Sequence, residues 1–523
     1  MKNIIKLSSI AIAMAVATSC VNDLERTPFI EITSATVYND PANYKQILAK
    51  MYAGYALSGQ QGPAGQADIS GIDEGFSTYL RQYWKAQELP TDEAVIGWND
   101  GSLRDYNDMD WTSSNEFITA MYNRIYYQIT LCNEFIRETT DAKLASRGIS
   151  DSNITAFRAE ARFLRALSYY HALDMFGNVP FVTENDAVGS FFPEQTTKAE
   201  LFSYIESELT AIDGLLVAAK QNEYGRADKA AAWTLLAKLY LNAETYIGQP
   251  KYTEAIDNCK KVIASGYALD ANYANLFLAD NDRSNEIIFP ITFDGIRSKT
   301  WGGMTFLVHA PVGGSMNPAD FGINGGWSGL RTTSKFVSNF ADISGNTDKR
   351  AMFFTDGQNR VVEDIFTFTD GFAITKYKNV TSGGQPGSDV EGNFPDTDFP
   401  MFRLADVYLM YAEAVLRGGS GGDNATALSY VNALRQRAYG NASGNVSSID
   451  LDFMLAERAR ELYWEGHRRT DLVRFGKLTS GDFVWDWKGN VPQGRGVDAK
   501  YNIFPLPSAD IIANPNLKQN NGY

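Results

Sequence analysis

The chain has 523 residues, and its 62 acidic and 47 basic residues give a formal net charge of −15 at neutral pH. Because Lys and Arg are not gathered into a basic stripe, this charge argues against nucleic acid as a partner. Hydrophobic residues make up 44% of the chain, which is enough to bury a large core. Beyond the N-terminal segment no run is apolar enough to cross a membrane.

The N-terminal segment predicts export and attachment to a lipid. Lys2 and Lys6 precede an apolar run of about eleven residues, and small residues then lead to Cys20. The apolar run is shorter than the roughly 20 residues that a membrane span needs. A Cys directly after such a cleavage zone is the acyl acceptor of bacterial lipoproteins, so we expect a signal peptide at 1–19 and lipidation of Cys20. The alternative is plain secretion with an incidental Cys.

Repeated pairs of amphipathic helices predict a mainly α fold. The clearest pair joins 229–242 to a helix that begins at Tyr252, across the short polar turn GQPK, with apolar residues at helical spacing. A helix, turn and helix of about 34 to 37 residues is similar to a tetratricopeptide repeat. We therefore expect a tetratricopeptide-like helical-repeat scaffold, with repeats at about 40–57, 115–137, 156–265 and 402–440.

Two long inserts interrupt the helical pattern, at about 58–112 and 280–400. They are rich in Gly, Asn, Asp and aromatic residues and contain only short strand-like runs such as EIIFPITF. Loops of this length inside a folded protein are usually functional, so we expect the ligand-binding surface on these inserts and the helical repeats as its support.

The remaining cysteines and the histidines argue against several chemistries. Cys132 and Cys259 each lie in a helical apolar pattern, which favours buried packing over a disulfide framework. The three histidines, His171, His309 and His467, show no spacing typical of zinc ligands.

Several long segments carry a resemblance to one family. They are RAEARFLRALSYYHALDMFGNVPF at 158–181, GRADKAAAWTLLAKLYLNA at 225–243, FRLADVYLMYAEA at 402–414 and ERARELYWEGHRRTDLVRFG at 457–476. The chain resembles the SusD-like (RagB/SusD) outer-membrane lipoproteins of the Bacteroidetes over nearly its whole length. We therefore expect 20–523 to form a single SusD-like domain. The stretch DISGIDEGFSTYLRQYWKAQELPTDEAVIGW at 68–98 is similar to the starch-binding founding member of that family.

The resemblance implies a binding protein rather than an enzyme. It would hold starch or maltooligosaccharides at the outer membrane, facing the cell exterior, and pass them to a SusC-like TonB-dependent transporter without any required cofactor. Asp23 and Glu25 resemble the export signal of such lipoproteins. Two alternatives stay open: a glycoside hydrolase that uses two of the many carboxylates, and a helical-repeat protein that binds peptides.

Three tryptophans are the leading candidates for the binding site. Trp98, Trp301 and Trp327 lie in the contexts GWND, TWGG and GGWS, where the neighbouring side chains are too small to bury them. Aromatic faces suit the apolar faces of sugar rings, although a Trp is also often a core anchor. By resemblance, these positions match the aromatic arc on which a curved starch chain rests.

Polar candidates accompany the tryptophans. Arg81 matches the guanidinium that reaches glucose hydroxyls in the family, and the alternative is an ion pair with a carboxylate such as Asp73 or Glu74. The chain also departs from the starch-binding pattern, because Ile96 replaces a second Trp and Gly101 replaces a polar residue. We expect Asn99 or Asp100 to supply the lost hydrogen bond.

A calcium ion is the one metal that the resemblance implies. Asp282, Asp396 and Asp398 resemble the calcium ligands of the starch-binding member, and hard oxygen ligands on loops suit calcium. Clustered Asp residues in loops also serve as turn caps, which is the alternative. If calcium is bound, we expect its role to be structural.

Overall fold

The computed structural model describes residues 34–523, except for residues 64 and 190. The signal peptide predicted at 1–19, the lipidation site Cys20 and the export signal at Asp23 and Glu25 lie outside the described residues. Contacts divide the chain into a short unit that ends at Tyr44 and a large unit from Lys45 to Tyr523, and each is described by itself. The short unit contains the helix α2 (Ser34–Val37), after which Tyr38 and Tyr44 pack edge to face, 5.6 Å between ring centroids.

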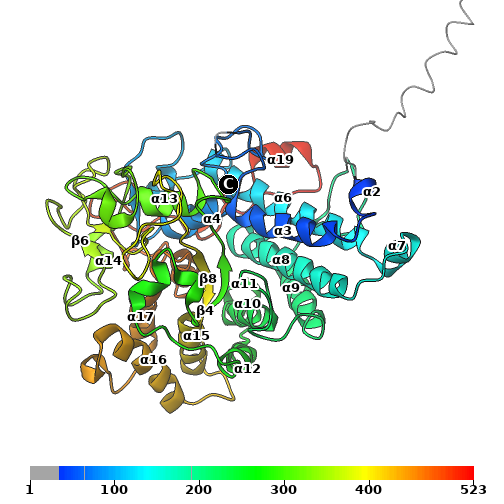
Figure 1. The fold of residues 1–523 in the computed structure, drawn as a ribbon. Helices are drawn as coiled ribbons and strands as arrows, with labels where there is room; N and C mark the ends of the chain where they lie inside the picture. Colours follow the sequence, from blue (N-terminus) through cyan, green and yellow to red (C-terminus); the bar gives the residue numbers. More distant parts are fainter. Residues whose placement is uncertain (1–33, 64, 190) are drawn as a thin grey trace, which may run out of the picture. The chain divides into compact units, whose positions relative to one another are not determined.

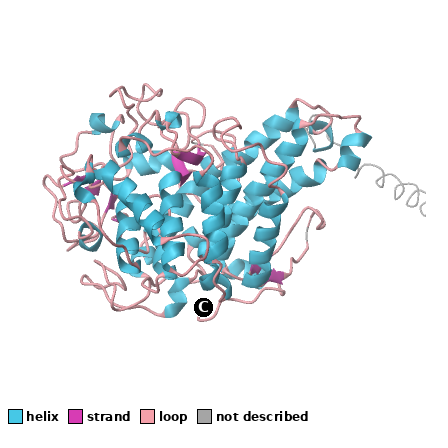
Figure 2. Ribbon diagram, turned by 90° about the horizontal axis from the view of Figure 1, so that it is seen from below, coloured by secondary structure: helices cyan, strands magenta, loops and turns pink. Residues whose placement is uncertain are grey.

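The large unit is mostly helical, with a few two-stranded ladders (Figure 2). Its longer helices are α3 (Asn43–Ala56, which begins in the short unit), α4 (Tyr79–Glu88), α6 (Glu116–Glu138), α8 (Asn153–Phe176), α9 (Lys198–Ala211), α10 (Lys229–Leu241), α12 (Tyr252–Ile263), α15 (Leu404–Leu416), α16 (Asn424–Tyr439) and α17 (Leu451–Leu462). The shorter ones are α5 (Asp105–Asp108), α7 (Asp141–Ser146), α11 (Ala243–Ile247), α13 (Gly303–His309), α14 (Ser334–Val337), α18 (Arg468–Arg474) and α19 (Ser508–Ala513). The predicted fold class is therefore confirmed.

Successive helices pack against one another. Helix α6 packs on α8, α8 on α9, α10 on α12, α12 on α15 and α15 on α16 (Figure 1). Small buried residues such as Ala230 and Ala237 allow close helix approach in α10. The Asp228 side chain caps this helix by accepting hydrogen bonds from the backbone N–H groups of Ala230 and Ala231, which would otherwise lack partners. Within the described residues, no helix is long and apolar enough to span a membrane.

The strands of the large unit form short antiparallel ladders. β4 (Ile287–Ile291) pairs with β8 (Phe399–Arg403), β2 (Val179–Pro180) with β3 (Gln195–Thr196), and β6 (Phe353–Phe354) with β7 (Ala373–Ile374). The ladder between β1 (Val95–Ile96) and β5 (Leu330–Arg331) matters most for the site. It joins the first insert to the second and places Trp98 and Trp327 beside each other.

The segment 457–476 forms a buried network of ion pairs. The Arg403 guanidinium contacts the carboxylates of Glu461 and Glu465 at 2.7 and 2.6 Å, and all three side chains are fully buried. Arg468 pairs with Asp92 at 2.7 Å, which anchors this segment to the turn after α4. Removing one partner from such a pair is costly because it leaves an uncompensated buried charge. The network therefore holds α4 in a defined place.

Candidate functional site

The structure brings the three predicted tryptophans together. The ring centroids of Trp98 and Trp327 lie 6.2 Å apart, and those of Trp327 and Trp301 lie 6.4 Å apart. The ring planes turn by 46° at the first step and by 50° at the second. Each ring is half-buried. We call these three residues the tryptophan arc, since they form one continuous aromatic surface that bends in steps.

Two aromatic residues that the sequence analysis missed join this arc. The Phe394 ring lies 4.8 Å from that of Trp301, and the His309 ring stacks on Trp327 at 4.9 Å with 24° between the planes. His309 had been considered only as a metal ligand. The one available signal for Phe394 was its place in a Gly- and Asn-rich insert, GNFPDTDFP.

Hydrogen bonds to backbone carbonyls hold the arc in place. The Trp98 indole N–H donates to the Trp327 carbonyl at 3.2 Å, and the Trp327 N–H donates to the His309 carbonyl at 2.9 Å. The His309 ring nitrogens lie 2.7 Å from the Gly325 carbonyl and 2.9 Å from the Asn393 carbonyl. Three separate loops are thus joined at one point, so the arc is organised before any ligand arrives.

Glycines that lie close in space pack against two of the tryptophans. A Cβ on Gly329 would lie within 3.0 Å of three indole atoms of Trp98, and a Cβ on Gly75 would lie 2.8 Å from the Cβ of Trp301. These two glycines let the backbone approach Trp98 and Trp301 closely. They are not the sequence neighbours that we expected to leave the rings uncovered.

Arg81 lies on α4. This helix packs next to α13 (Figure 1). Arg81 is only 4% exposed, and its Nη1 donates to the carbonyls of Gly75 at 3.0 Å and Trp301 at 3.4 Å. Its guanidinium carbon lies 4.3 Å from the ring centroid of Phe306 and 5.8 Å from that of Trp98. Burial lowers the pKa of Arg81 to about 9, although nearby carboxylates oppose the shift. Arg81 therefore supports Trp301, and its contact with sugar hydroxyls stays a prediction.

The residues beside Trp98 divide into exposed and buried ones. Asn99 and Asp100 are exposed. Ile96 is 2% exposed and pairs with Leu330, so this departure from the starch-binding pattern lies in the core. Gly101 has a φ of 47°, a left-handed conformation, and a Cβ there would clash with the Glu116 carboxylate. The local backbone thus explains why a Gly occupies this position.

The three carboxylates predicted to bind calcium do not form a ligand set as arranged. Asp396 accepts from the Gly295 N–H at 2.7 Å, and Asp398 accepts from the Phe293 N–H and the Tyr224 hydroxyl, both at 2.7 Å, while Asp282 is exposed. Burial raises the pKa of Asp398 to about 7. Across 34–523 without residues 64 and 190, no group of three or more His, Cys, Asp or Glu side chains could hold a metal ion. Asp396 and Asp398 thus already accept hydrogen bonds from the protein, and calcium binding at these residues stays a prediction.

Comparison with known proteins identifies relatives over the whole chain. A family model described as "SusD family" matches 363–523, and one described as "Starch-binding associating with outer membrane" matches 34–241. The chain is 36% identical to the starch-binding protein SusD of Bacteroides thetaiotaomicron, over 100% of this chain and 99% of that one. It is 25% identical to a SusD-like protein of Bacteroides ovatus, over 78% and 82% of the two chains.

Solved structures show the same fold. A surface glycan-binding protein A from Bacteroides fluxus has a TM-score of 0.71 at 20% identity, over 92% of this chain and 100% of that chain. Another from Bacteroides thetaiotaomicron, in complex with laminarihexaose, has a TM-score of 0.69 at 20% identity, over 92% and 99%. At this level of identity the likeness concerns the fold alone.

Proposed function

The chain belongs to the SusD family, and on this basis we propose that it is a lipoprotein of the cell surface that binds starch or maltooligosaccharides without cleaving them. The tryptophan arc carries the proposal. Sugar rings have apolar faces that pack on aromatic rings, and their hydroxyl edges need planar polar partners. The exposed Asn99 and Asp100 lie beside the arc and can supply them.

The stepwise bend of the arc favours a curved ligand. Neighbouring ring planes are inclined to each other by 46° and 50°, so a straight chain could not stack flat on two neighbouring rings. An α-glucan curves and can follow all three rings. The identity to a protein named for starch binding supports the same choice.

The proposed function includes delivery to a partner. The bound glucan passes to a SusC-like TonB-dependent transporter in the outer membrane, while the lipid on Cys20 keeps the protein on the outer face of the cell. The description of the matched family model as associating with the outer membrane supports this location. Affinity purification of the tagged protein from its native membrane, followed by mass spectrometry, tests the partnership.

Calorimetric titration with maltoheptaose tests the binding proposal. We expect binding by the wild-type protein, loss of binding in Trp327→Ala, and weaker or no binding of laminarihexaose. Trp233→Ala is a matched control, because this half-buried tryptophan on α10 makes one hydrogen bond and lies in a helix outside the inserts. Release of reducing ends from amylose by the pure protein, lost in Trp327→Ala, would contradict the non-catalytic proposal. Normal binding by Trp327→Ala would contradict the site.

A further inference from the structure

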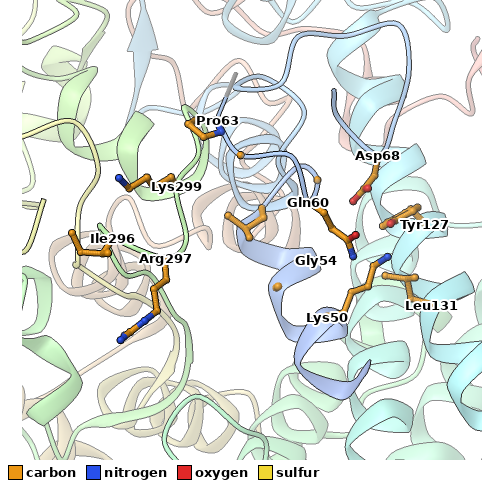
Figure 3. A pocket seen from close by; sticks show the side chains of 14 residues that line it. Lys50, Gly54, Gln60, Pro63, Asp68, Tyr127, Leu131, Ile296, Arg297 and Lys299 are labelled. Atoms are coloured by element: carbon orange, nitrogen blue, oxygen red, sulfur yellow. The ribbon is translucent and has the colours of Figure 1, made fainter. Parts of the chain in front are cut away.

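A pocket of about 350 Å³ lies beside the tryptophan arc and is not part of it. It is formed by α3, the loop after α3, α6 and the segment 296–299 (Figure 3). Pockets that bind small ligands start at about this volume. The pocket has no place in the site described above, although one of its walls comes from the same segment as Trp301.

The side chains of the pocket suit a sugar. Lys50, Gln60, Asp68 and Tyr127 gather on one wall, while Lys299 lies on the other (Figure 3). Tyr127 offers a half-buried aromatic ring, and burial together with the neighbouring Asp68 raises its pKa to about 12, so its hydroxyl keeps its proton at neutral pH. An aromatic ring surrounded by polar side chains is the chemistry that a sugar unit requires.

Two donors in the pocket are not used by the protein itself. Within the described residues, Lys50 and Gln60 have no hydrogen-bond or ion-pair partner, whereas many polar side chains in this fold are paired. An ammonium group and a side-chain amide at one wall can donate to the hydroxyls of a neutral sugar. Binding a sugar there would use donors that otherwise face only water.

One chain segment, 299–301, connects the pocket to the arc. Lys299 is two residues from Trp301, so their Cα atoms are at most about 7 Å apart. The Lys299 ammonium lies 5.6 Å from the Phe394 ring centroid, and that ring packs on Trp301. A glucan chain that leaves the arc past Trp301 on this side would come close to Lys299, which lines the pocket.

A buried carboxylate links the two places rigidly. Glu74 accepts from the Thr300 hydroxyl at 2.7 Å and from the Trp301 N–H at 3.3 Å. It also accepts from the Ser58 hydroxyl at 2.5 Å, and Ser58 directly precedes the pocket residue Gly59. The wall of the pocket and the backbone of the arc are thus held by the same side chain.

We propose that this pocket is a second subsite, which takes the next sugar units of a neutral glucan whose preceding units lie on the tryptophan arc. The inference rests on the proposed function. A chain that reaches both places gains affinity, because its second contact forms at a high effective concentration. A short oligosaccharide seated on the tryptophans ends before the pocket and gains nothing from it.

The test compares short and long maltooligosaccharides by calorimetric titration. The double variant Lys50→Ala, Gln60→Ala removes both free donors, and since each hydrogen bond contributes modestly we expect about tenfold weaker binding of maltodecaose. Binding of maltotriose should be unchanged. The control is Lys45→Ala with Gln46→Ala, which removes the same two kinds of side chain from α3 at positions outside this pocket.

The outcomes separate the two proposals. Failure of the wild-type protein to bind either oligosaccharide would contradict the proposed function itself. Wild-type binding with no effect of the double variant on maltodecaose, or with an equal loss for both chain lengths, would overturn the second subsite. Electron density for sugar in the pocket of a crystal soaked with maltodecaose would support it independently.

Discussion

Gly329→Ala tests whether the tryptophan arc is held in position by the close contact between the Gly329 backbone and the Trp98 ring. The added Cβ would lie within 3.0 Å of three atoms of the Trp98 indole, whereas ordinary contacts begin at 3.4 Å. The backbone at this position cannot easily yield. The Gly329 N–H donates to the Ala310 carbonyl at 2.8 Å, and its carbonyl accepts from the Gly97 N–H at 2.9 Å. The ring must therefore move, by several tenths of an ångström or more.

The expected cost follows from this geometry. Forcing one extra carbon into a packed site typically costs about 1 to 3 kcal/mol. The displaced Trp98 also loses its hydrogen bond to the Trp327 carbonyl, which should weaken maltoheptaose binding about tenfold. Calorimetric titration and thermal unfolding measure the two effects.

Gly325→Ala is the matched control for this substitution. It adds the same methyl group to the same loop, but at a position where nothing lies within 4 Å of the new Cβ. Its affinity and unfolding temperature should equal those of the wild type. Wild-type affinity in Gly329→Ala, or an equal loss in both variants, would refute the reasoning.

Three further predictions concern His309, the buried carboxylates near α4 and the candidate calcium site. His309→Phe keeps a ring that can stack on Trp327 but loses both polar contacts, so we expect a partial loss of maltoheptaose affinity and a change in tryptophan fluorescence; an unchanged spectrum and affinity would contradict a positioning role. Burial raises the pKa of Glu88 to about 7 and also raises the pKa of Glu93. These two carboxylates therefore bind protons more tightly in the folded protein than in the unfolded chain. Their contribution to the free energy of unfolding should fall as pH rises from about 4.5 to 7. Glu93→Gln should make this fall smaller in urea unfolding at pH 5 and pH 8, and an identical pH dependence in the variant would argue against it. If calcium binds at Asp396 and Asp398, added calcium should raise the unfolding temperature of the wild type but not of Asp396→Asn; no shift in the wild type would reject the metal.

Several features of this protein could be predicted from the sequence because their signal is local. Apolar residues such as Ala230, Ala237 and Tyr240 recur at helical spacing within a short stretch of sequence. Spacing of this kind correctly predicted α10 and α12. The change of composition in the two inserts likewise indicated where the tryptophans would stand apart from the helices.

The arrangement of the site was decided by the tertiary structure. Trp98 and Trp327 are 229 residues apart in the chain, and the β1–β5 ladder that joins their loops has only two residues in each strand. So short a ladder has almost no sequence pattern of its own. Its pairing depends on the packing of the helices that carry both inserts.

The same reason explains why contacts of single residues could not be predicted. Arg81 is buried and donates to the Trp301 carbonyl, and Gly329, which lies far from Trp98 in the sequence, packs on its ring. Residue type and local period determine which segments form helices and which residues can bind a sugar. Burial and ring contacts depend on residues distant in sequence, so only the folded chain determines them.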